Sequence, residues 1–187
     1  MACGEFGEGK MSSPRQIISY LENFFKNLEI GKNNFFTDVS NYLSYELGQP
    51  THCFDKDKIE GKIVFENKEC SEKFETLLGS QIELKGKNSV FMNNDKIISL
   101  AGVMGGESTA CSKENRKVIV ECAYFDPEAS IGKSLDYSLS SEAAHKFERG
   151  VDQDCQERVL RRFINIVSEH TNIKDMSIIT HKYRENS

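Results

Sequence analysis

The hydrophobic pattern of this chain changes its period twice along the sequence. Apolar residues follow helical spacing from Ser13 to Leu28 and again from Asp38 to Leu47. Between residues 62 and 125 short β-rich runs alternate with turn signals, and helical spacing then returns. Strands grouped in one run with helices at both ends predict an α+β fold rather than a regular strand–helix alternation.

The segment boundaries follow from capping and turn residues. We expect the second helix to begin with Asp38 as its N-cap and to end at Gly48, which leaves His52 and Phe54 on a loop. Two more helices are predicted near residues 142–147 and from Asp152 to about His170. The predicted strands are residues 62–66, 81–84, 89–93, 96–103, 118–125 and 176–180, with turns at 79–80, 85–87 and 93–95.

Length and composition favour one domain. The chain has 187 residues, of which 38% are hydrophobic, enough for a single core. Residues 1–11 are rich in Gly and Glu and are expected to be a linker, a leader or added residues, with one domain over residues 12–187. The net charge of −5 argues against a free-standing nucleic-acid-binding protein. The sequence has no run of about 18 apolar residues, so no membrane span is predicted.

The six cysteines favour reduced thiols in the cytoplasm. None belongs to a C-x-x-C pair, and none lies at zinc-finger spacing from a histidine. We therefore expect neither a disulfide framework nor a structural metal.

Two segments are candidates for a site, one around His52 and one rich in glycine. His52 follows the break at residues 48–50 and lies close to Asp55, so the imidazole is either part of a pocket edge or an ordinary surface group. Residues 100–108 contain three glycines after an apolar strand. They match neither a phosphate-binding loop nor a dinucleotide-binding turn, which leaves a sharp turn or a close approach to a ligand.

A third candidate is Glu121, a carboxylate inside an otherwise apolar strand. It shares a strand face with Ile119 and Ala123. Burial of a carboxylate requires a partner, which is either a structural ion pair, for example with Arg149, or a ligand donor. By contrast, Glu142 and Lys146 at i,i+4 spacing predict a solvated helix face.

Four segments together resemble a known family. Residues 38–55, 100–110, 120–127 and 141–152 (DVSNYLSYELGQPTHCFD, LAGVMGGESTA, VECAYFDP and SEAAHKFERGVD) are similar to the B3/B4 editing domain in the β subunit of bacterial phenylalanine–tRNA ligase. The resemblance covers residues 13–187 and implies a mixed three-layer sandwich. It also implies hydrolysis of the ester of tyrosine mischarged to tRNA(Phe), because an apolar synthetic site rejects an added hydroxyl poorly.

The resemblance also implies roles for individual residues. Glu121 would accept the phenol hydroxyl, while Asn41 and His52 would lie near the amino acid's backbone and the scissile ester, with His52 positioning water. Gly102 and Gly105 would give backbone clearance for an aromatic ring, and Ala143 would form the opposite wall. No metal or cofactor is implied for this domain, since ATP and Mg²⁺ belong to the synthetic site of the parent enzyme.

The implied partners are the 3′ end of tRNA(Phe) carrying tyrosine, the remainder of the β subunit, and the α subunit of an α2β2 tetramer. No membrane is implied. Family members usually carry several basic residues in the stretch that corresponds to residues 129–141, where this chain has only Lys133. A non-catalytic structural or tRNA-docking module of the same subunit is therefore the alternative.

Overall fold

The computed structural model describes residues 33–181 together with Glu22 and Lys26. The first predicted helix, from Ser13 to Leu28, lies outside the described residues apart from these two. The remainder forms helices and two antiparallel sheets, which confirms the α+β prediction.

A long hairpin forms half of the larger sheet. Strands β2 (Ile63–Glu75) and β3 (Gln81–Asn93) pair along their whole length, from Ile63 opposite Asn93 to Glu75 opposite Gln81. The predicted turn at residues 85–87 is wrong. Gly86 has φ +67° yet stays in the ladder opposite Cys70, because a residue without Cβ adopts this conformation inside a strand without steric cost.

The four-stranded sheet has the order β2-β3-β4-β5, with β4 at Lys96–Leu100 and β5 at Met104–Gly105. The β2–β3 hairpin curls back so far that Thr76, just past β2, pairs with Gly106, just past β5. The hairpin tip therefore lies beside β5, at the opposite end of the strand order.

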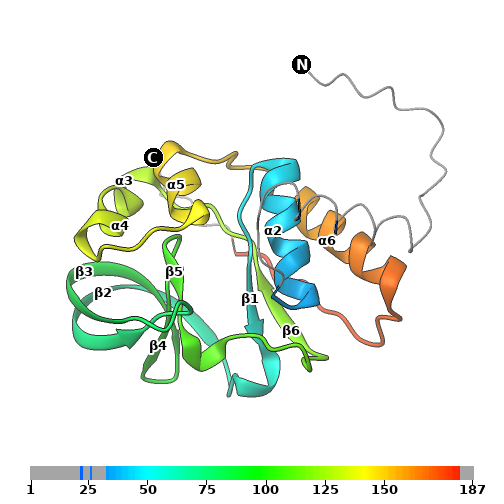
Figure 1. Ribbon diagram of the computed structural model, residues 1–187, viewed down its shortest axis with the longest axis horizontal. Helices are drawn as coiled ribbons and strands as arrows, with labels where there is room; N and C mark the ends of the chain where they lie inside the picture. The colour runs from blue at the N-terminus through cyan, green and yellow to red at the C-terminus, as the bar shows by residue number, and fades with distance from the viewer. Residues whose placement is uncertain (1–21, 23–25, 27–32, 182–187) are drawn as a thin grey trace.

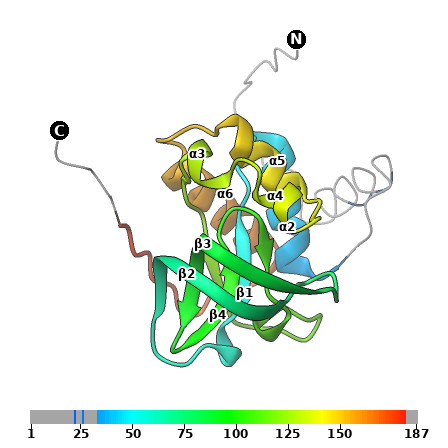
Figure 2. The same cartoon turned by 90° about the vertical axis from the view of Figure 1, so that its left-hand side faces the viewer.

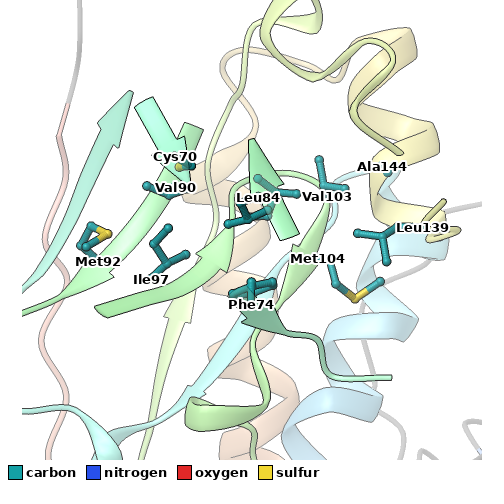
Figure 3. Close-up of a cluster of buried hydrophobic side chains, with 11 residues drawn as sticks. Cys70, Phe74, Leu84, Val90, Met92, Ile97, Val103, Met104, Leu139 and Ala144 are labelled. Carbon is teal, nitrogen blue, oxygen red and sulfur yellow. The ribbon is translucent and has the colours of Figure 1, made fainter. Parts of the chain in front are cut away.

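The curled sheet encloses the larger apolar core (Figure 3). Side chains of β2, β3 and β4 meet the β4–β5 turn, and Leu139 and Ala144 enter from the helical side. The buried members are Cys70, Phe74, Leu84, Val90, Met92, Ile97, Leu100, Val103, Met104, Leu139 and Ala144.

The second sheet pairs two short strands far apart in sequence. β1 (His52–Asp55) runs antiparallel to β6 (Val118–Glu121). The loop predicted around His52 is therefore a strand, which sequence patterns did not indicate because its partner lies outside the local window. β6 ends at Glu121 rather than at residue 125, since the Ala123 carbonyl accepts a hydrogen bond from the buried Gln49 side chain at 2.9 Å instead of from a strand.

Helices α2 (Phe35–Leu47) and α6 (Gln156–His170) cover one face of β1–β6. Asn34, not Asp38, caps α2, because its Oδ1 accepts the Thr37 N–H at 3.0 Å. The predicted end at Gly48 is confirmed by its left-handed φ of +74°. α6 begins later than predicted, since Asp152 forms a turn by accepting the Asp154 N–H at 2.9 Å.

Three short helices lie together at one end of the large sheet (Figure 2). They are α3 (Pro127–Ser130), α4 (Lys133–Asp136) and α5 (Glu142–Arg149), the last confirming the helix predicted at 142–147. Two 3₁₀ turns, η1 (Lys56–Lys58) and η2 (Glu107–Thr109), complete the elements. The strand predicted at 176–180 is wrong, because these residues are exposed and pair with no strand of the described chain.

The elements stack in three layers (Figure 1): α2 with α6, then β1–β6, then the four-stranded sheet. Cys53 and Val120 pack toward the helices, whereas Phe54, Ile119 and Ile98 pack between the two sheets. Over the described ranges, no helix is long and apolar enough to cross a membrane.

The closure of the large sheet at Gly106 gives a stability prediction. A Cβ at this position would lie 2.8 Å from the Ile98 carbonyl oxygen and 3.0 Å from the Phe74 ring. Gly106→Ala should lower the free energy of unfolding by about 1–3 kcal/mol in urea titrations, because a backbone atom must shift. Glu107→Ala, at the exposed neighbouring position, should stay within about 0.5 kcal/mol of the original chain. Equal effects of both variants would contradict a steric cause.

Candidate functional site

The site begins with two residues that face each other across the small sheet. His52 of β1 and Glu121 of β6 are direct partners in the antiparallel register. Side chains of such partners lie on one face with Cβ atoms about 4.5–5.5 Å apart. This face also carries Phe54 and Ile119 and points toward the four-stranded sheet. The two side chains therefore start from paired positions on this face, and no hydrogen bond or salt bridge joins them in the described chain.

The imidazole of His52 lies directly over the backbone of Gly105. A Cβ on Gly105 would collide with His52 Cε1 and would lie 2.9 Å from Nε2. The ring meets Phe54 edge to face at a centroid distance of 4.5 Å. Nε2 is buried and has no hydrogen-bond partner. Burial lowers the pKa of His52 to about 4, so the imidazole is neutral at pH 7.

Glu121 has the opposite shift for the same reason. Burial raises its pKa to about 7, and a hydrogen bond from the Ala123 backbone N–H partly offsets this effect. The considered ion pair with Arg149 does not form, since Arg149 is exposed and no salt bridge of Glu121 exists among the described residues. The carboxyl group thus has no cationic partner and is half ionised near neutral pH.

Gly102 and Ala143 meet in a neighbouring aromatic cluster. Gly102 lies in the β4–β5 turn with φ +70°, and a Cβ there would lie 2.9 Å from Phe125 Cδ2 and 3.4 Å from Phe147 Cδ2. Ala143 of α5 packs against the buried cluster that contains these two rings. This cluster is connected to His52 by successive ring contacts from Phe54 to Phe91 at 6.2 Å and from Phe91 to Phe125 at 6.1 Å.

Asn41 lies on α2, the helix that packs against the other face of β1. Helical spacing places it on the same side of α2 as Ser44 and Tyr45. Lys146 of α5 contacts both of these residues: its Nζ donates to the Ser44 carbonyl at 2.6 Å and lies 4.6 Å from the Tyr45 ring centroid. Because Lys146 follows Ala143 by three residues on α5, Asn41 and Ala143 both lie near the contact between α2 and α5. No hydrogen bond joins Asn41 to His52 in the described structure.

Lys146 is the residue near the site that sequence reasoning missed. The predicted solvated pair with Glu142 is wrong, since the two form no salt bridge, and burial instead lowers the pKa of Lys146. Its Nζ also donates to Ser44 Oγ at 2.8 Å, near the C-terminal end of α2, where a cation is favourable. Local sequence carries no signal for this contact, because the two residues are 102 positions apart.

The described residues contain no group of three or more His, Cys, Asp or Glu side chains able to hold a metal ion. The arrangement therefore offers acid–base and hydrogen-bonding chemistry from protein side chains: a neutral imidazole with an unpaired nitrogen, and a carboxyl group that titrates near pH 7.

The fold and this pair define a class of protein, an α+β domain with a histidine and a glutamate between two antiparallel sheets. Comparison with known proteins gives the family. The model of the B3/4 domain matches residues 2–172. The chain belongs to the B3/4 domain family.

Three relatives are phenylalanine–tRNA ligase beta subunits. The chain is 34% identical over 140 residues to that of Francisella tularensis subsp. tularensis, 37% over 132 residues to that of Methylococcus capsulatus, and 38% over 132 residues to that of Vibrio parahaemolyticus. These matches cover 75%, 71% and 71% of this chain but only 18%, 17% and 16% of the relatives. The chain thus corresponds to a small part of each beta subunit.

The two shifted pKa values predict opposite effects of pH on stability. From about pH 4.5 to 7 the folded chain keeps a proton on Glu121 that the unfolded chain releases, so this contribution to the unfolding free energy falls as pH rises. From about pH 4 to 6.5 only the unfolded chain protonates His52, so that contribution rises with pH. In the original chain the two slopes oppose each other where the ranges overlap.

Single substitutions should separate the two slopes. Urea titrations from pH 4 to 7.5 should show stability of Glu121→Gln rising with pH relative to the original chain, and stability of His52→Gln falling. Each difference should be on the order of 1–3 kcal/mol across the range. Identical pH profiles of all three proteins would show that neither group has the stated pKa.

Proposed function

We propose that this chain hydrolyses the ester between tyrosine and the 3′ end of mischarged tRNA(Phe). The observation that carries the proposal is the cross-strand pair of His52 and Glu121, in which one member has an unpaired nitrogen and the other titrates near pH 7. Membership of the B3/4 domain family and similarity to phenylalanine–tRNA ligase beta subunits support it.

Glu121 would select tyrosine over phenylalanine. Its ionised carboxylate accepts a hydrogen bond from the phenol hydroxyl, and a bond to a charged acceptor contributes about 1.5–3 kcal/mol. Phenylalanine has no hydroxyl group to donate, so its complex lacks the free energy of this hydrogen bond. A site that requires the hydroxyl thus removes the amino acid that an apolar synthetic pocket rejects poorly.

His52 would position the attacking water. A general base is most effective with a pKa near the working pH, and a pKa of about 4 makes this imidazole a weak base at pH 7. A neutral imidazole still offers one donor and one acceptor, so Nε2 can fix a water molecule or a ribose hydroxyl beside the ester carbonyl. The terminal ribose hydroxyl, supplied by the substrate, would share in activating the water.

The small residues would shape the site around the substrate's ring. Gly102, Gly105 and Ala143 lie at the two ends of the row of aromatic rings that begins at His52. The space beside Gly102 holds Phe125 and Phe147, and the space beside Gly105 holds His52, so entry of an aromatic ring requires side chains to move. Asn41 would contact the amino acid's backbone from α2.

We also propose the setting in which the domain acts. The matched relatives are beta subunits several times longer than this chain, so the remainder of such a subunit and its α subunit would hold the tRNA. Within residues 129–141 the sole basic side chain is Lys133, and its Nζ donates to the Lys87 carbonyl at 2.9 Å. The isolated chain should therefore bind tRNA weakly, because phosphate contacts supply much of that affinity. The proposed location is the cytoplasm.

The alternative is a non-catalytic structural or tRNA-docking module of the same subunit. The observation that favours it is the complete burial of His52 Nε2 beneath neighbouring side chains, which denies a substrate direct access in this conformation. The two functions differ in whether the chain discriminates tyrosine from phenylalanine.

Calorimetry with the free amino acids tests the role of Glu121. Tyrosine should bind more tightly than phenylalanine, and the preference should grow about fivefold from pH 6 to pH 8 as the carboxyl group ionises. Glu121→Ala should erase the preference. Glu121→Gln should keep a smaller preference that no longer changes with pH. Equal affinities for both amino acids in the original chain would rule out Glu121 as the phenol acceptor.

Release of tyrosine from Tyr-tRNA(Phe) tests the reaction itself, with Phe-tRNA(Phe) as the control substrate. The chain at high concentration should release tyrosine selectively, and His52→Ala should slow release by about 10- to 100-fold because water loses its fixed position. His145→Ala is the matched control, since His145 is exposed on α5. Equal hydrolysis of both substrates, or no effect of His52→Ala, would contradict the proposed mechanism.

A further inference from the structure

The turn between β2 and β3, residues 76–80, lies against the site. Thr76 and Ser80 fix its shape through a backbone hydrogen bond from Thr76 N–H to the Ser80 carbonyl at 2.9 Å and a contact between their hydroxyl groups at 2.7 Å. The turn is attached beside β5 by the pairing of Thr76 with Gly106 and by the bond from Leu77 N–H to the Gly105 carbonyl at 3.0 Å.

This attachment places the Leu77 side chain beside the imidazole of His52. The position that a Cβ on Gly105 would occupy lies 2.6 Å from Leu77 Cδ1 and 2.9 Å from His52 Nε2. Both side chains therefore share the space over the Gly105 Cα, and glycine is the residue that leaves room for both.

Leu77 also lies at the boundary between this buried nitrogen and solvent. Leu77 is 37% exposed, whereas His52 Nε2 is buried without a hydrogen-bond partner. Burial of a polar nitrogen without a hydrogen-bond partner costs folding free energy. This cost is relieved when Nε2 binds a water molecule or a group of a ligand.

We infer that Leu77 is the access-controlling residue of the site: its side chain covers His52 Nε2, and displacement of the β2–β3 turn admits water and the ester. The use of this opening rests on the proposed hydrolytic function, but the cover itself is a property of the chain. The turn is attached to β5 by few bonds, and such segments open locally at a small fraction of the global unfolding free energy.

Carbethoxylation by diethyl pyrocarbonate tests the cover without any tRNA. The reagent attacks unprotonated imidazole nitrogens, and burial lowers the pKa of His52 to about 4, so at pH 7 its rate reports access to the two ring nitrogens rather than protonation. Peptide mapping by mass spectrometry separates the four histidines. In the original chain His52 should react much more slowly than the exposed His145.

Three variants make the test specific. Leu77→Ala should speed the modification of His52 by about tenfold or more, since its protecting side chain is truncated. Leu77→Met, which nearly conserves volume, should keep the slow rate. Leu78→Ala is the matched control, because Leu78 lies in the same turn, is 68% exposed and is not among the side chains nearest the position of a Gly105 Cβ. The rate of His145 should be the same in all four proteins.

Two results would overturn the inference. One is an unchanged His52 rate in Leu77→Ala, which would assign the cover to other side chains. The other is equal acceleration by Leu78→Ala, which would indicate general loosening of the turn. Neither depends on hydrolysis, so failure of the proposed function with a fast His52 in Leu77→Ala would leave the cover established.

Discussion

The pairing of β1 with β6 is the interaction on which the site depends. Four residue pairs join one strand that precedes the large sheet in sequence to one that follows it, and one of these pairs is His52 with Glu121. The helices α2 and α6 bury the other face of the same two strands, so the pair is fixed by the packing of the helical core. The partner of each residue across the small sheet is therefore distant in sequence.

Much of the scaffold was predictable from local patterns, because capping residues and hydrophobic periodicity act over a few positions. The end of α2 at Gly48, the helix α5 and the start of the strand that contains Glu121 were predicted in this way. Three of the errors share one cause, which is a partner distant in sequence. Pairing with β6 makes His52 part of a strand, the Ser44 carbonyl binds Lys146, and Gln49 ends β6. The cap at Asn34 rather than Asp38 is instead a local difference, made by the hydrogen bond from the Thr37 N–H to Asn34 Oδ1.

His52, Glu121 and the glycine segment were candidates from their sequence context, and the resemblance supplied their roles together with Asn41 and Ala143. His52 packs over Gly105 and is paired across the small sheet with Glu121, and burial moves both titratable groups toward their neutral forms. Burial thus leaves a neutral imidazole and a half-ionised carboxyl group on paired positions of the small sheet. Their shifts follow from depth in the fold, and no spacing of residue types in the sequence would reveal them.

The long segment that connects β1 to β6 has a thermodynamic consequence. His52 and Glu121 are separated by about 70 residues, and this segment contains the whole four-stranded sheet, so bringing them together carries the entropy cost of closing a long loop. A ligand that touches both residues binds only the closed chain. Its binding free energy therefore adds to the stability of the entire domain, and occupancy of the site and integrity of the fold become a single linked equilibrium.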